Sequence, residues 1–124
     1  MKILTLIARL LLGLMFVVFG SNAFLHFMPM PPLPETPGGR FIGAMLDSGY
    51  IYAVALCQIV GGALLLAGRF VPLGLVILGP VVVNIVLYHI FMDLAGMGVA
   101  VCVAVFFLFL LWRYREAFAP LLRP

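Results

Sequence analysis

Six side chains that can donate or accept hydrogen bonds stand inside long apolar stretches of this chain: Asn22, His26, Gln58, Asn84, Tyr88 and His89. Polar groups in apolar surroundings are costly and usually face the interior of a helix bundle, so each is a candidate binding residue. Counted at about 1.5 Å per residue from the same end of their stretches, the three amides fall in one layer. Two interpretations have equal weight. The amides form a ligand site, or they hold helices together at about 1 kcal/mol each.

Three pairs of polar residues have helical spacing, Asn84 and Tyr88 among them. Asn22 and His26 are four residues apart and would share one helix face. His89 would share a face with Asp93 in the same way. A carboxylate beside an imidazole can orient the ring, so we expect a His89–Asp93 pair.

The other reactive side chains are sparse. Cys57 and Cys102 stand at similar depth in two different apolar stretches. They could form a redox pair if those two helices touch, or they could be small apolar core residues. There is no HExxH, no CxxCH, no Gly-rich phosphate loop and no Ser/His/Asp arrangement. The two histidines lie near the ends of their stretches without further ligands, so we expect no metal site.

The composition decides which solvent surrounds these residues. The chain is 66% hydrophobic and 9% charged, whereas soluble chains are about 45–50% apolar and about 25% charged. Too few charges remain to cover a water-facing surface, which predicts an integral membrane protein with one domain over residues 1–124. The formal charge of +3 is carried at the ends of the apolar stretches, so we expect no nucleic-acid partner.

Four stretches are long enough to cross a bilayer, at about residues 3–27, 50–67, 72–92 and 94–112. They lack the alternation of a membrane β-barrel. The first is longer than the roughly 7–15 apolar residues of a secretory signal, so we expect it to be retained. The predicted fold is an all-α membrane four-helix bundle.

The basic residues predict the orientation of this bundle. Six of seven lie at one end of the predicted spans: Lys2, Arg9, Arg69, Arg113, Arg115 and Arg123. Arg40 stands at the other end, with three of the four acids. Basic residues concentrate on the cytoplasmic side, which predicts that both termini are cytoplasmic in a multi-pass protein of the cell membrane.

The long connection at residues 28–49 is therefore expected outside. The stretch HFMPMPPLPETPGGRF begins two residues before this connection and continues into it, with prolines at 29, 31, 32, 34 and 37. These prolines favour an extended polyproline path, while Met30 and Leu33 are too apolar for a free linker. We expect a strap over the outer mouth of the bundle that leads into a short helix at Arg40–Ser48. This helix has an apolar stripe of Phe41, Ile42, Met45 and Leu46, and it lies in the membrane interface or packs against the bundle.

Glycines inside the spans predict close helix packing. Gly61 and Gly62 in the second span, with Gly13 and Gly20 in the first, would let the backbones approach one another.

Three segments together resemble the DoxX family of small four-span bacterial membrane proteins: RLLLGLMFVVFGSNAFLHF, QIVGGALLLAGRFVPLGLVILGP and RYREAFAP. The resemblance extends over essentially the whole chain and implies a bacterial inner-membrane location. The family position that precedes the Gly-Gly pair commonly carries a glutamate, and Gln58 stands there in this sequence. An ionisable group is therefore missing at that site.

The family takes its name from a subunit associated with quinol oxidation and thiosulfate:quinone oxidoreductase activity. The resemblance thus implies a redox-associated accessory protein that binds a quinone or another lipophilic ligand, with a membrane oxidoreductase or a second copy as partner. A quinone head group would need donors such as the six polar side chains above. Because no complete catalytic arrangement is present, a non-catalytic scaffold for a partner complex and an oligomeric small-solute transporter are the alternatives.

Overall fold

The computed structural model describes all residues 1–124, and every regular element in it is helical. Four long helices dominate: α1 (Lys2–Leu25), α3 (Tyr50–Ala67), α4 (Val71–Phe91) and α5 (Met97–Arg113). Each is long and apolar enough to cross a membrane, with α5 extended by the 3-10 turn η1 (Leu94–Gly96). The all-helical class and the four predicted spans are confirmed.

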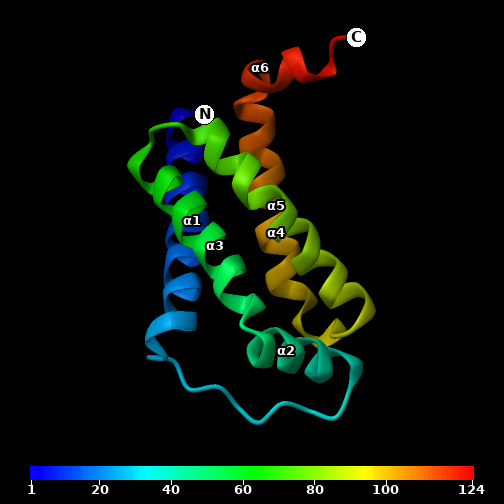
Figure 1. Cartoon of the computed structure of the whole chain (residues 1–124). Helices are drawn as coiled ribbons and strands as arrows, with labels where there is room; N and C mark the ends of the chain where they lie inside the picture. The colour runs from blue at the N-terminus through cyan, green and yellow to red at the C-terminus, as the bar shows by residue number, and fades with distance from the viewer.

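The four long helices form a closed ring. α1 packs against α3 and α5, and α4 packs against the same two helices. Both termini lie at one end of the ring, where α5 continues into α6 (Arg115–Phe118) and η2 (Ala119–Leu122) (Figure 1). α2 (Pro37–Ser48) lies across the other end. We call these the termini end and the α2 end.

Most helix bounds agree with the sequence to within a few residues. α3 covers residues 50–67 as expected, and α4 is shifted by one residue. α1 ends at Leu25 instead of residue 27, because His26 takes a left-handed conformation (φ 52°) and its N–H donates to the Asn22 carbonyl. The expected fourth span begins as the 3-10 turn η1, and regular α-helix starts only at Met97.

The short helix α2 begins three residues before the expected start at Arg40. The Thr36 side chain accepts a hydrogen bond of 3.2 Å from the Gly39 N–H, and Pro37 occupies the first helical turn, where its missing N–H costs nothing. The expectation that Pro37 belongs to the extended strap was therefore wrong. A cap and a proline together outweigh the poor helix propensity of Gly38 and Gly39.

The strap at residues 26–36 does not line the mouth of the bundle itself. It runs along the outer side of α2 (Figure 1), where the Pro34 carbonyl contacts Gly39 and Leu33 reaches Gly43. α2 stands between the strap and the long helices. The predicted cover over the polar layer is formed by α2, because an amphipathic helix can bury one stripe of side chains while satisfying its own backbone.

Glycines bring the backbones of neighbouring spans together. A Cβ on Gly13 would lie 2.8 Å from the Gly62 carbonyl oxygen, and one on Gly62 would lie 2.7 Å from that of Gly13. On the other side of α3, a Cβ on Gly74 would lie 3.1 Å from the Gly61 oxygen. The adjacent glycines of α3 thus serve two interfaces, one with α1 and one with α4, and the predicted close packing is confirmed.

The hydrophobic core occupies the half of the bundle nearer the termini end. It consists of Ala8, Leu12, Phe16, Leu65, Val71, Leu75, Leu78, Val81, Val82, Val103, Phe107 and Leu110. Most of these residues stand in the halves of the four long helices nearer the termini end, while Phe16, Val82 and Val103 stand just beyond the middle of their helices. The α2 end holds far fewer buried side chains, and the helices enclose open space there.

Candidate functional site

A cavity of about 750 Å³ lies at the α2 end between α2, α3 and α4. Thirteen of its eighteen lining residues are hydrophobic, and its polar groups include Gln58, Asn84, Tyr88 and His89. Pro80 and Asn84 are both exposed on the protein surface and line the cavity, so the cavity opens sideways between helices. A mostly apolar cleft of a few hundred Å³ with a few polar groups is the usual form of a small-molecule site.

The two amides approach the cavity from neighbouring antiparallel helices. Gln58 is eight residues into α3 and Asn84 is seven residues before the end of α4, which places both about 10–12 Å from the α2 end. The Asn84 amide donates a 3.0 Å hydrogen bond to the Pro80 carbonyl of its own helix. Its oxygen has no partner within the protein, and the Gln58 side chain, which is half-buried, makes no hydrogen bond.

Tyr88 and His89 occupy the part of the cavity wall closest to α2. The ring centroids of these neighbours are 5.1 Å apart in an edge-to-face arrangement, and the Tyr88 ring lies 5.8 Å from that of Phe41 on α2. A Cβ on Gly38 would lie 3.1 Å from the Tyr88 hydroxyl. Tyr88 therefore joins α4 to α2 at the cavity rim.

The expected pair of His89 and Asp93 is present. The His89 Nδ1 lies 3.0 Å from the Asp93 backbone carbonyl oxygen and 3.6 Å from its carboxylate Oδ2. A carbonyl can only accept, so Nδ1 carries the hydrogen of this contact. The neutral imidazole is then left with Nε2 as a hydrogen-bond acceptor.

Sequence reasoning missed two contributions to this wall. The first is Gly96, where any Cβ would collide with the His89 ring, so that the absent side chain makes room for the imidazole. The second is the inner face of α2, through Phe41 and Met45. Only the hydrophobic stripe on α2 indicated this face in the sequence, and a stripe does not say which helices it will contact.

Asn22 and His26 lie apart from the other four predicted residues, because neither lines the cavity. The Asn22 Oδ1 accepts a 2.8 Å hydrogen bond from the Met28 N–H and so closes the end of α1. His26 follows the helix in its left-handed conformation with an exposed side chain. The His26 backbone N–H still donates to the Asn22 carbonyl, but no hydrogen bond joins the two side chains.

The two cysteines are both free and exposed. Cys57 lines the cavity one residue before Gln58, whereas Cys102 on α5 is not part of its lining. They form no disulfide.

Comparison with known proteins identifies the family to which the chain belongs. A family model described as DoxX matches residues 4–91, well over half of the chain. The chain belongs to the DoxX family. The DoxX match ends at the last residue of α4 and includes the whole cavity lining.

A second comparison finds one relative among curated proteins. The chain is similar to the uncharacterized protein YwoB of Bacillus subtilis (strain 168), with 32% identity over 122 residues, 93% of this chain and 79% of that protein. No solved structure matches significantly. Family and helices together make this a multi-pass membrane protein of the DoxX family.

Proposed function

We propose that this DoxX protein is a redox-associated accessory that binds a quinone in the cavity between α2, α3 and α4. The observation that carries the proposal is the pair of amides on Gln58 and Asn84. Both open into one cavity at the same depth, and both keep unused hydrogen-bonding capacity. Such capacity in a hydrocarbon environment costs several kcal/mol unless a polar partner arrives.

A quinone fits the chemistry of the cavity. Its carbonyl oxygens accept hydrogen bonds, which amide N–H groups and the Tyr88 hydroxyl can donate. A quinol hydroxyl donates instead, and the free Nε2 of His89 is suited to accept it. The isoprenoid tail would leave through the lateral opening beside Pro80 and Asn84 into lipid.

The proposed site leaves Asn22 and His26 aside, because the first already has a backbone partner and the second does not line the cavity. The proposal also keeps the orientation expected from the basic residues, with the termini end in the cytoplasm of the inner membrane. The cavity then lies in the outer half of the bilayer. Quinone would enter from the membrane, and a partner oxidoreductase would have to supply or take the electrons.

Binding of decylubiquinone by the purified protein in nanodiscs tests the proposal. We expect saturable binding by the wild type, weakened about tenfold by Gln58→Leu or Asn84→Leu, since a hydrogen bond to a buried group is worth about 1.5 kcal/mol. Asn22→Leu is the matched control, an amide of the same layer outside the cavity, and should leave affinity within about twofold. Absence of saturable binding, or equal losses in all three variants, would sink the idea.

A non-catalytic scaffold is the second candidate, and one observation favours it. Asn84 is exposed in the middle of a spanning helix, where its oxygen could accept a hydrogen bond from a polar residue of a partner helix. Mild crosslinking from position 87 distinguishes the two, because Leu87 lies one turn along the same helix, is 44% exposed and does not line the cavity, so that Asn84 stays intact. A stoichiometric protein adduct in membranes, insensitive to added decylubiquinone, would favour the scaffold, and loss of the adduct on adding quinone would favour the ligand site.

A further inference from the structure

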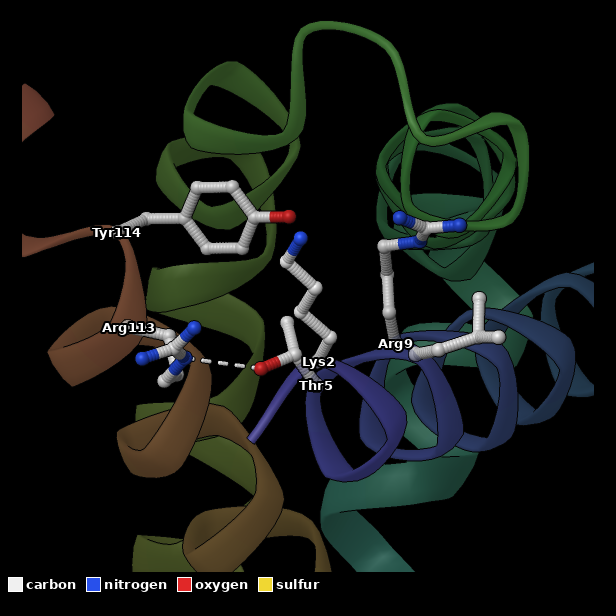
Figure 2. Close-up of a pocket in the computed structure, with 6 residues that line it drawn as sticks. Lys2, Thr5, Arg9, Arg113 and Tyr114 are labelled. Atoms are coloured by element: carbon white, nitrogen blue, oxygen red, sulfur yellow. Dashed lines mark hydrogen bonds between the residues drawn. The ribbon is translucent and has the colours of Figure 1, made fainter.

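A second pocket, of about 440 Å³, lies at the termini end, on the opposite side of the core from the cavity. It is lined by Lys2, Thr5, Leu6, Arg9, Arg113 and Tyr114. Figure 2 shows these side chains reaching it from α1, from the end of α5 and from just beyond it, below the turn that joins α3 to α4. Three of the six are cations and none is an acid.

The Arg9 guanidinium lacks a partner in this pocket. Its Nε is buried without a hydrogen bond, and no ion pair in the structure involves it. Arg9 sits seven residues into α1, and its side chain extends to the α3–α4 turn, where a Cβ on Gly68 would lie 3.0 Å from Cζ and from both terminal nitrogens. The planar Arg9 guanidinium therefore packs against the backbone at Gly68, while its N–H groups make no hydrogen bond within the protein.

Arg113 is held in place by Thr5. Its Nε donates a 2.9 Å hydrogen bond to the Thr5 hydroxyl oxygen, and that hydroxyl in turn donates to the Met1 carbonyl. One edge of the guanidinium is thus occupied, and the terminal N–H groups remain available. The Lys2 ammonium and the Tyr114 hydroxyl, both drawn in Figure 2, add two further donors without partners.

The surrounding charges do not neutralise this cluster. Six of the seven basic side chains of the protein stand at the termini end, with Glu116 as the single acid there. Glu116 does not line the pocket and pairs with none of its cations. Guanidinium, ammonium and hydroxyl donors that line one pocket match the oxygens of a phosphate group, which arginine binds through two parallel hydrogen bonds.

We propose that this pocket binds the phosphate group of an anionic phospholipid, with Arg9 and Arg113 as its principal ligands. The acyl chains have a surface beside it, because Leu6 and Leu10 of α1 are 44% and 39% exposed. Basic pockets between spanning helices are suited to anionic head groups in this way. A soluble phosphate would satisfy the same donors without using the apolar surface.

Native mass spectrometry of the full chain in dodecyl maltoside tests the proposal with dioleoylphosphatidylglycerol as probe and dioleoylglycerol, which has the same acyl chains but no phosphate, as reference. We expect phosphatidylglycerol to bind at least tenfold more tightly, and Arg9→Gln or Arg113→Gln to reduce that affinity about tenfold. Arg123→Gln is the matched control, since it removes the same charge from the same end outside the pocket, and should change affinity less than about twofold. Lys2→Gln, at an exposed position, should weaken binding in the same direction.

A test with inorganic phosphate distinguishes a phospholipid head group from a soluble phosphate ion as the ligand of this pocket. If 10 mM phosphate raises the melting temperature of the wild type but not of Arg9→Gln, while the two lipids bind equally, the oxyanion site stands and its ligand is soluble. Equal binding of both lipids without any phosphate effect would overturn the site. So would an equal loss in Arg9→Gln and Arg123→Gln, because binding would then depend only on the net charge of this end.

Discussion

Replacing Gly62 by alanine should destabilise the bundle at the interface between α1 and α3. The added Cβ would lie 2.7 Å from the Gly13 carbonyl oxygen, and 3.0 Å and 3.1 Å from Cγ2 and N of Val17. Ordinary contact begins at 3.4 Å. Two of these three atoms belong to the backbone, so a side-chain rotation cannot relieve the overlap and the helices must separate.

The magnitude follows from two opposing effects. Overpacking of a tight interface costs about 1–3 kcal/mol, and removing a glycine from the middle of a helix returns roughly 0.5–1 kcal/mol. We therefore expect Gly62→Ala to lower the free energy of unfolding by about 1–2 kcal/mol. The matched control is Gly79→Ala in α4, where the nearest atom to the new Cβ is Cζ of Phe107 at 3.6 Å. This control should be neutral or slightly stabilising.

Unfolding by sodium dodecyl sulfate in mixed micelles, followed by far-ultraviolet circular dichroism, measures both variants. A second experiment combines Gly62→Ala with Gly13→Ala. Each new methyl group would meet the carbonyl of the other residue, so once the helices have separated for one, the second should cost less than it does alone. If Gly62→Ala unfolds at the same detergent fraction as Gly79→Ala, the argument from backbone contact is refuted.

Three further outcomes follow from local contacts. Thr36→Ala removes the cap of α2 at a cost of about 1 kcal/mol, so amide exchange in α2 should accelerate roughly fivefold while α3 stays unchanged; equal acceleration in both helices would contradict this. Gly96→Ala should displace the His89 ring and remove its 3.0 Å Nδ1 contact, visible as a shifted imidazole ¹⁵N resonance; an unchanged resonance would contradict the packing. Decylubiquinone should slow modification of Cys57 by N-ethylmaleimide in a Cys102→Ala protein, and leave Cys102 unaffected in the reciprocal variant; equal protection would argue against the proposed site.

Much of the candidate site could be anticipated because helical geometry is local. Gln58 and Asn84 stand at equal depth in antiparallel helices, so counting residues was enough to place their amides in one layer. The i,i+4 relation of His89 and Asp93 survived even though α4 ends at Phe91. The same counting did not apply to His26, because one left-handed residue ends the helix and removes the periodicity on which the estimate depends.

The amino-acid sequence by itself determined the membrane class, the four spans and the glycine positions at which backbones approach, since these depend on hydropathy, length and side-chain size along one helix. Only the tertiary structure decided which faces meet. It placed α2 between the strap and the long helices, as a wall of the cavity, and it left Asn22 outside that cavity. It also brought Arg9 and Arg113, from opposite ends of the chain, into the lining of one pocket. Helix rotation and the path of a connection depend on contacts between distant residues, which no local pattern encodes.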